Sequence, residues 1–348
     1  MNQTQKNIVL PAEWYPQSFV QLTFPHAATD WAYMLDEVSE CFCEIIENIL
    51  RFENVLVVCA DKESEQKIRN VKSKVNSDYY LHIVKCPLND TWARDHSGIT
   101  VFENGKKTVL DFTFNGWGLK FAANFDNQIT KHIFTNNSQL LFPNSFIYRD
   151  CRQFIIEGGS IESDGEGTIL TTEKCLLSEN RNYLDKSEIE QKLREYFGAE
   201  RILWLSNGSL AGDDTDSHID TLARFCSPDT IAYLQCDDCN DEHFAELNLM
   251  EEELKAFRQK NGEPYNLLPL PMADAIFDEN GERLPATYAN FLIINGAVLV
   301  PTYNSSQDEI ALAQIQFAFP DREIIGIDCR ALIRQHGSLH CVTMQFPK

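Results

Sequence analysis

The strongest constraint on the fold of this chain is a repeated alternation between short apolar runs and single helical segments. The run at residues 55–59, rich in Val, is typical of a buried strand. The charged stretch that follows it, residues 61–76, has the spacing of a helix. The alternation recurs at intervals of roughly 60 to 70 residues, although no sequence identity between the units is visible. It predicts an α/β or α+β fold and leaves the overall architecture open.

The same patterns predict further strands and helices along the chain. Strands are expected at residues 81–84, 168–172, 201–205 and 323–327, a hairpin at 99–110, and two strands within 291–301. Helices are expected at residues 187–197, 242–260 and 308–319, the first of them ending at Gly198. No low-complexity stretch or long flexible linker interrupts this series, so we expect a single domain over residues 1–348.

The charge balance bears on the class of partner. Lys and Arg total 30 and Asp and Glu total 52, which gives a formal net charge of -22. Phosphate contacts need clustered basic residues, so a nucleic-acid partner is not expected. A cationic ligand would suit an acidic protein, but many acidic proteins bind no such ligand.

Cysteine usage and the apolar runs bear on the cellular compartment. The 11 cysteines are an odd number scattered through a large chain, so reduced thiols in the cytosol are the simplest interpretation. The lone CxxC at residues 236–239 has no second pair, which favours ordinary cysteines over a zinc or redox site. The apolar runs at 291–294 and 297–300 are too short to span a bilayer, and residues 1–6 are polar, unlike a secretory signal. We therefore expect a cytoplasmic protein without a membrane partner.

Two segments combine carboxylates with residues that suit a binding site. In Asn89-Asp-Thr-Trp-Ala-Arg-Asp95, Asp95 could accept two hydrogen bonds from a guanidinium, with Trp92 as an apolar wall. The alternative is a surface loop in which Arg94 pairs with an acid. Glu157 follows an expected strand and precedes two glycines, which let the backbone approach a ligand closely. Glu157 could orient a histidine, or it could be a solvated side chain in a turn.

The densest polar cluster lies at residues 212–220. His218 and Asp220 are two residues apart, so on an extended strand they would share one face, as a base and a carboxylate acting on one substrate require. The segment from Asp213 to Asp220 also offers several metal-ligating oxygens, so a metal-dependent hydrolase is an alternative. The chain lacks an HExxH motif and the spacing of an EF-hand, and no metal is expected.

A thiol stands almost at the end of the chain, in Gly337-Ser-Leu-His-Cys341. A thiolate is a strong nucleophile, although a lone cysteine is more often a buried core residue. His340 is a poor candidate for its base, because adjacent residues on a strand point to opposite faces. His218 is a better candidate, since a nucleophile and its base usually meet only in the fold.

Taken in order, these segments resemble the agmatine deiminase family, which includes bacterial-type peptidylarginine deiminases. The segments that carry the resemblance are Leu10-Pro-Ala-Glu-Trp14, Phe24-Pro-His26, Asp30-Trp31, Asn89-Asp-Thr-Trp-Ala-Arg-Asp95, Phe114-Asn-Gly-Trp-Gly118, Glu157-Gly-Gly-Ser160, Gly165-Glu-Gly-Thr168, Leu170-Thr-Thr172, Asn180-Arg-Asn182, Thr215-Asp-Ser-His-Ile-Asp220, Leu222-Ala-Arg-Phe225, Tyr288-Ala-Asn-Phe291, Val300-Pro301 and Leu339-His-Cys341. They span nearly the whole chain, and their number and order are far more specific than any one motif.

The resemblance implies a fold, a mechanism and a set of site residues. The implied fold is a five-bladed, pseudo-symmetric α/β-propeller (pentein) of ββαβ-type repeats, in a single catalytic domain without a cofactor. By resemblance, Cys341 is the nucleophile and His218 the general acid and base. Asp95 and Asp220 hold the guanidinium, and Glu157 orients His218 or binds the substrate. Trp92 and Trp117 fall in segments that line the family's site.

The implied reaction is the conversion of agmatine to N-carbamoylputrescine and ammonia. Two departures from the family pattern leave the substrate open: residues 335–339 replace a glycine run, and residues 96–99 replace a Gly-Pro pair that many members carry. Deimination of a C-terminal arginine in peptides is a close alternative. An amidinotransferase and a non-catalytic binder of cations are further alternatives for the function, and a homo-oligomer is an alternative to a monomer.

Overall fold

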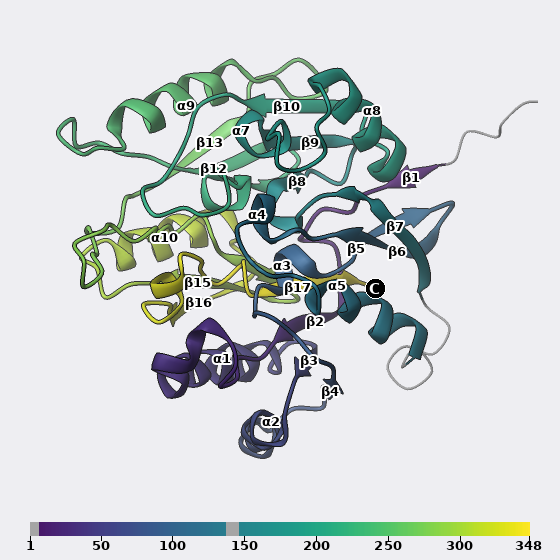
Figure 1. Cartoon of the computed structure of the whole chain (residues 1–348). Helices are drawn as coiled ribbons and strands as arrows, with labels where there is room; N and C mark the ends of the chain where they lie inside the picture. The colour runs from purple at the N-terminus through teal and green to yellow at the C-terminus, as the bar shows by residue number, and fades with distance from the viewer. Residues whose placement is uncertain (1–6, 137–145) are drawn as a thin grey trace, which may run out of the picture.

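The computed structural model describes residues 7–136 and 146–348. Its strands form five separate sheets within these residues, and helices connect them in a mixed α/β fold. Figure 1 shows the short helix α3 (Ala93–His96) near the middle of the view, with the longer helices at the periphery. Residues 1–6, whose polar sequence argued against a secretory signal, lie outside the described part.

Three consecutive sheets contain the same succession of an antiparallel strand pair, a helix, and a strand parallel to the second strand. The sheets are β8 (Ile161–Ser163), β9 (Thr168–Thr172) and β10 (Arg201–Leu205); β11 (Ala223–Ser227), β12 (Thr230–Leu234) and β13 (Asn266–Leu270); and β14 (Leu292–Ile294), β15 (Ala297–Thr302) and β16 (Glu323–Asp328). The connecting helices are α8 (Lys186–Phe197), α9 (Phe244–Ala256) and α10 (Asp308–Ala318). The loose periodicity of the sequence therefore corresponds to repeated ββαβ units.

The other two sheets contain the same unit and one added strand each. In one, β5 (Ile99–Glu103), β6 (Lys106–Thr113), α5 (Asp126–Lys131) and β7 (Ile147–Ile155) form the unit, and β1 (Ile8–Val9) adds to β5. In the other, β17 (Thr343–Pro347), β2 (Gln17–Thr23), α1 (Leu35–Ile49) and β3 (Asn54–Cys59) form the unit, and α2 (Lys62–Lys74) leads to β4 (Leu81–Lys85). Because β17 pairs with β2, the last strand of the chain shares a sheet with its second strand.

Short helical turns occupy many of the remaining connections. They are η1 (Asp30–Met34), α4 (Gly116–Leu119), η2 (His132–Asn136), η3 (Gly158–Ser160), α7 (Glu173–Leu176), η4 (Ile219–Thr221) and η5 (Leu332–Gln335). Turn η3 contacts both α3 and η4, so three connections from different sheets meet. This meeting point positions the polar segments that the sequence singled out.

Local sequence explains where the predicted helices begin and end. Helix α8 starts at a capping box, in which Asp185 and Glu188 each accept a hydrogen bond from the other's backbone N–H. It ends at Gly198, whose φ of 69° is the left-handed conformation that glycine adopts without strain. The side chain of Asp61 caps α2 by accepting from the backbone N–H of Ser64. The strands predicted from apolar runs are confirmed as β3, β4, β9, β10 and β16.

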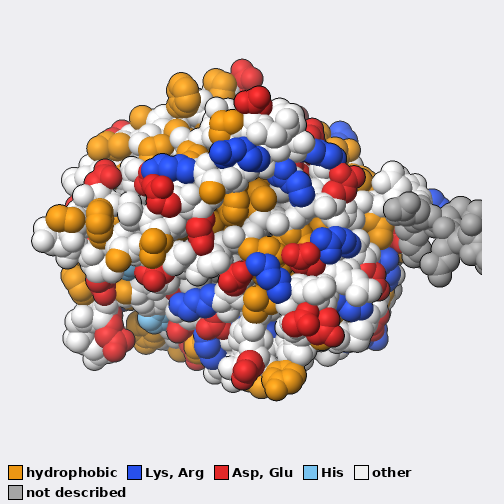
Figure 2. Space-filling model, turned by 90° about the horizontal axis from the view of Figure 1, so that it is seen from above, with side chains coloured by type: hydrophobic (Ala, Val, Ile, Leu, Met, Phe, Trp, Pro, Cys, Tyr) orange, Lys and Arg blue, Asp and Glu red, His pale blue; other side chains and the backbone are white. Residues whose placement is uncertain are grey.

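The helices pack through their apolar faces, and the polar side chains lie outside. In α1, Val38, Phe42, Ile45 and Ile49 are fully buried at the three- and four-residue spacing of one helix face. On the face shown in Figure 2, basic and acidic side chains are interspersed despite the large negative net charge. No helix within residues 7–136 and 146–348 has both the length and the apolar character needed to cross a membrane.

Candidate active site

The predicted site residues occupy equivalent places in the repeated units, since each lies just before the first strand of a ββαβ unit. Asp95 precedes β5, Glu157 precedes β8, His218 and Asp220 precede β11, and Cys341 precedes β17. The fifth sheet contributes Asn290, which precedes β14. Five connections, one leading into each sheet, thus supply the polar side chains of the candidate site. Figure 1 allows α3, which carries Asp95, to be followed among the surrounding sheets.

The sequence-based placement of His218 and Asp220 on one extended strand was wrong. His218 ends an irregular loop, and Asp220 lies in the short turn η4. The side chain of Asp213 shapes the loop by accepting from the backbone N–H groups of Thr215 (3.1 Å) and Ser217 (2.6 Å). Both functional side chains are fully buried. A side-chain-capped loop, rather than the alternation of a strand, brings them together.

Cys341 also lies outside a strand, in the turn before β17, so the strand argument against His340 does not apply. Asn290 fixes this turn, because its Oδ1 accepts from the backbone N–H groups of His340 (2.8 Å) and Cys341 (3.3 Å). The same oxygen lies 3.4 Å from the Cys341 Sγ. The sequence analysis quoted the segment that contains Asn290 but assigned the residue no role. A neutral amide outside a charged motif gave little signal.

Each carboxylate oxygen of Asp95 accepts one hydrogen bond. Its Oδ2 accepts from the Trp117 indole Nε1 at 3.0 Å, and its Oδ1 accepts from the Gly159 backbone N–H at 3.0 Å. The Nδ1 of His218 lies 3.6 Å from Oδ1. Asp95 is therefore an oriented carboxylate beside the histidine.

Asp220 lies on the other side of the thiol. Its Oδ2 is 4.0 Å from the Cys341 Sγ and 2.7 Å from the His340 Nδ1. Within the described residues, the buried Oδ1 of Asp220 has no hydrogen-bond partner, and neither has either ring nitrogen of His218. Buried polar atoms normally have partners, so these three atoms are the ones available to a ligand.

Glu157 is paired with an arginine that the sequence analysis did not identify as a site residue. Both of its carboxylate oxygens accept from the Arg181 Nε at 3.0 Å, and both side chains are fully buried. Arg181 also donates to the Asp216 side chain (2.8 Å) and to the Thr215 carbonyl (2.8 Å). Arg181 thereby fixes Glu157 relative to the loop that carries His218. The Asn180-Arg-Asn182 segment, part of the family resemblance, was the available signal.

The proximity of these charges shifts their pKa values. Burial raises the pKa of Asp95 to about 6, and the neighbouring Asp220 and Glu157 carboxylates add to burial while His218 opposes it. Burial would lower the pKa of His218, but Asp95, Cys175 and Glu157 together raise it to about 10. His218 is thus an imidazolium at neutral pH in the unliganded protein.

The pKa values of the thiol and of the second carboxylate move in opposite directions. Burial, followed by the negative charges of Asp220 and Asp95, raises the pKa of the Cys341 thiol well above its usual range. Burial also acts to raise the pKa of Asp220, but the hydrogen bond and charge of His340 lower it below its usual value. At rest the site holds a protonated thiol next to an ionised carboxylate.

Asp95 and Cys341 line a cavity of about 170 Å³, whereas Glu157, His218 and Asp220 are not part of its lining. Its walls contain three aromatic side chains, four acidic side chains, the thiol and a short turn, contributed by Trp92, Trp117, Phe121, Asp30, Asp90, Asp95, Asp214, Thr215, Cys341 and residues 335–337. No Lys or Arg is among the described residues that line it. The two tryptophans suggested by the resemblance therefore lie in the cavity wall, and the cavity is suited to a cation with an apolar stem.

Two groups of three possible metal ligands occur among the described residues. They are Glu157, Cys175 and His218, and Glu13, Glu162 and His340. Arg181 already pairs with Glu157, and Arg224 already bridges Glu13 and Glu162. The segment from Asp213 to Asp220 contributes to these groups only through His218. A guanidinium occupies the cation position at each group, so neither fits a metal site.

Comparisons with known proteins agree with this arrangement. The profile of the family described as Porphyromonas-type peptidyl-arginine deiminase matches residues 9–347. A crystal structure from Porphyromonas gingivalis, provisionally assigned as an arginine deiminase, is 52% identical with a TM-score of 0.91, covering 98% of this chain and 99% of that one. An agmatine deiminase of C. jejuni with substrate bound is 40% identical with a TM-score of 0.90, covering 100% of this chain and 98% of that one.

A curated relative gives the same result at lower identity. The agmatine deiminase of Pseudomonas aeruginosa is 30% identical over 362 residues, which cover 97% of this chain and 95% of the relative. The fold and the relatives together show that this chain is a hydrolase of C–N bonds in guanidino groups. The chain belongs to the Porphyromonas-type peptidyl-arginine deiminase family.

Proposed function

We propose that this chain hydrolyses agmatine to N-carbamoylputrescine and ammonia, with Cys341 as the nucleophile. The observation that carries the proposal is the cluster of His218, Asp95, Asp220 and Cys341, of which Asp95 and Cys341 line a cavity whose described lining contains no Lys or Arg side chain. The C. jejuni structure supports a cysteine mechanism, because the protein crystallised with substrate was a cysteine-to-serine variant.

A guanidinium is a poor electrophile, and the carboxylates offset this by holding it in place for attack. Asp95 and the free Oδ1 of Asp220 grip its nitrogens and hold the central carbon near the Cys341 Sγ. The thiolate attacks this carbon, and the His218 imidazolium protonates the departing nitrogen, which leaves as ammonia. A covalent S-alkylthiouronium remains on the sulfur.

The second half of the reaction regenerates the thiol. His218, now neutral, removes a proton from water, and the resulting hydroxide attacks the thiouronium carbon. The C–S bond breaks and the ureido product leaves. In this scheme Glu157 orients His218, and its pairing with Arg181 keeps it from moving toward the substrate.

Substrate binding also activates the nucleophile in this scheme. The negative charges of Asp220 and Asp95 contribute to the raised pKa of the Cys341 thiol. A guanidinium bound between these carboxylates offsets both charges, so we propose that Cys341 releases its proton to solvent in the substrate complex and becomes the thiolate.

The cavity favours agmatine over free or C-terminal arginine. Agmatine ends in an ammonium, and Asp30, Asp90 and Asp214 are carboxylates in the cavity wall. Arginine would bring an α-carboxylate near these acids, without a described Lys or Arg in the lining to pair with it. Peptidyl arginine remains the second candidate, because the matching family is described as a peptidyl-arginine deiminase.

We extend the proposal to the architecture of the fold and to the cellular location of the protein. The five ββαβ-containing sheets, with site residues in equivalent connections and with β17 paired to β2 in one sheet, support a five-bladed propeller around the site. All 11 cysteines lie within the described residues and are free, which supports a cytoplasmic location.

A panel of guanidines tests which of them is the substrate. Ammonia release should be compared for agmatine, arginine, guanidinobutyrate and peptides with a C-terminal arginine. We expect the highest kcat/KM for agmatine. A preference for the arginyl peptides would show that peptidyl arginine, and not agmatine, is the substrate. A requirement for an acceptor amine would indicate an amidinotransferase.

A further inference from the structure

His340, the neighbour of the proposed nucleophile, is held between two carboxylates. Its Nδ1 lies 2.7 Å from Asp220 Oδ2, and its Nε2 lies 2.7 Å from Glu13 Oε2. All three side chains are buried. An ionised carboxylate only accepts hydrogen bonds, so two such partners require a proton on each ring nitrogen. The geometry therefore requires an imidazolium at His340.

The surrounding charges agree with ionised carboxylates at both ends. Burial acts to raise the pKa of Glu13, but Arg224, His340 and Arg94 hold it well below its usual value. The pKa of Asp220 is lowered as well, chiefly by His340 against the effect of burial. Each carboxylate is thus stabilised in its charged form by the imidazolium between them.

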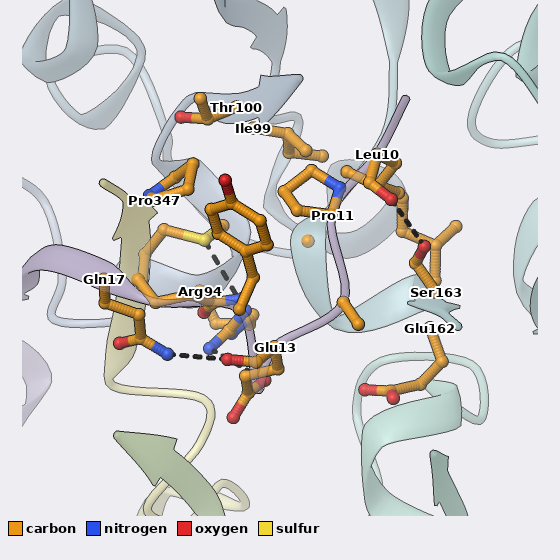
Figure 3. Close-up of a pocket in the computed structure, with 16 residues that line it drawn as sticks. Leu10, Pro11, Glu13, Gln17, Arg94, Ile99, Thr100, Glu162, Ser163 and Pro347 are labelled. Atoms are coloured by element: carbon orange, nitrogen blue, oxygen red, sulfur yellow. Dashed lines mark hydrogen bonds and ion pairs between the residues drawn. The ribbon is translucent and has the colours of Figure 1, made fainter. Parts of the chain in front are cut away.

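Basic side chains from other elements complete the network around Glu13. Arg224 of β11 donates to Glu13 Oε2 at 2.7 Å and also pairs with Glu162 of β8. Arg94 of α3 lies 3.8 Å from Glu13 Oε2 and donates to the His340 carbonyl at 3.4 Å. Figure 3 shows Glu13, Arg94 and Glu162 around a second cavity, of about 60 Å³, which shares no lining residue with the active-site cavity.

We propose that His340, fixed by Glu13, is the positioning residue for Asp220. His340 binds Asp220 Oδ2 and so leaves Oδ1 free for the substrate guanidinium. This inference rests on the proposed function of Asp220. Glu13 lies far away in sequence, and its role is to keep His340 protonated and turned toward Asp220. His340 contacts Asp220 directly and Glu13 contacts His340, so His340 acts through Asp220 and Glu13 acts through His340.

Two substitutions at one position separate positioning from simple packing. In His340→Asn, the amide nitrogen sits where Nδ1 was and can still donate to Asp220, but the link to Glu13 is lost. In His340→Gln, the amide reaches Glu13 and the link to Asp220 is lost. Val342→Ala removes a fully buried side chain from the same segment and is the matched control for lost packing.

We expect the two substitutions to differ in activity on agmatine. His340→Gln should lower kcat/KM on the order of 100-fold, mainly through a higher KM, and His340→Asn by about 10-fold. Both should raise the pKa of Asp220, because Asp220 loses a neighbouring cation, so a second ionisation should join that of Asp95 on the acid side of the pH profile and steepen it. Val342→Ala should leave this steepness unchanged. Equal losses in both His340 variants with an unchanged acid limb would overturn the proposal.

A measurement on the unliganded protein does not depend on activity. With ¹⁵N-labelled histidine, the ring of His340, assigned from its absence in His340→Asn, should carry protons on both nitrogens near pH 7. A ring with a single proton would overturn the inference, even if agmatine is hydrolysed and even if His340→Gln does not fold. A doubly protonated ring in a protein that releases no ammonia from any guanidine would support the pairing and refute the proposed function.

Discussion

Gly159 lies so close to His218 that a β-carbon on it would come within 2.6 Å of the ring Nδ1. The same β-carbon would lie 2.9 Å from Asp95 Oδ1 and 3.0 Å from Asp220 Oδ2. Gly159 therefore brings the backbone against three of the ionisable side chains of the site. The Gly159 N–H also donates to Asp95, so the close approach is part of how that carboxylate is oriented.

Gly159→Ala should abolish activity while the protein still folds, because the methyl group must displace either the imidazole or a carboxylate. We expect at least a 100-fold loss of kcat/KM on agmatine, since displacements of about 1 Å in a reacting site have effects of this size. Circular dichroism and thermal melting report the fold. Gly326→Ala, which crowds only a Thr302 methyl and Leu312 away from the site, is the control and should keep normal turnover.

Trp117→Phe should weaken the grip on the substrate by removing the indole donor to Asp95. A hydrogen bond to a charged group contributes about 1.5 to 3 kcal/mol, so we expect a decrease in kcat/KM of about 10- to 100-fold. Trp204→Phe is a matched control, because its indole donates to Glu190 on a helix outside the site. If the two variants lose activity equally, the bond from Trp117 to Asp95 does not contribute to catalysis.

The pH profile of kcat/KM should have an acid limb near pH 6 and an alkaline limb near pH 10. The acid limb reflects Asp95, whose pKa is raised to about 6 and which must be ionised to bind a guanidinium. The alkaline limb reflects loss of the His218 imidazolium, whose pKa is about 10. Trp117→Phe should move the acid limb upward, because the Trp117 hydrogen bond lowers the pKa of Asp95. An acid limb near pH 4 in the native enzyme would contradict the assignment.

Stability should be higher at pH 6.5 than at pH 8.5. Burial raises the pKa of Glu53 to about 8 and that of Asp126 to about 7, so the folded protein takes up protons in this window that the unfolded chain does not. The stabilisation from His218 is fully present below its unfolded pKa of roughly 6.5 and is lost as pH rises through about 10. All three contributions therefore decrease from pH 6.5 to 8.5.

Urea unfolding at the two pH values measures this difference. We expect a free energy of unfolding larger at pH 6.5 by on the order of 1 to 3 kcal/mol. Glu53→Gln should flatten the dependence, because it removes one of the carboxyl groups that takes up a proton. A free energy that rises from pH 6.5 to 8.5 would show that these carboxyl groups do not have raised pKa values.

The sequence predicted the elements well where one local signal acted alone. Apolar runs identified strands such as β9, and the Gly198 cap identified the end of α8. The order of the motifs along the chain identified the family, which no single spacing could have done. Local signals failed where long-range pairing decides the conformation.

The loop before β11 shows a different failure. The two-residue spacing of His218 and Asp220 suggested a strand, but local hydrogen bonds to the side chain of Asp213 fold the segment into a capped loop. Asn290 and the Glu13–His340 pair were missed because their contacts are long-range. Glu13 is 327 positions from His340 in sequence, and only the pairing of β17 with β2 brings the two chain ends together.

Ammonia release from agmatine by Cys341→Ala tests the central claim most directly. Cys175→Ala is the control, because Cys175 is a buried thiol beside His218 that does not line the cavity. We expect Cys341→Ala to fold normally and release no ammonia above the uncatalysed rate, and Cys175→Ala to keep most of its turnover. Retained turnover in Cys341→Ala would contradict the proposal that this thiol is the nucleophile.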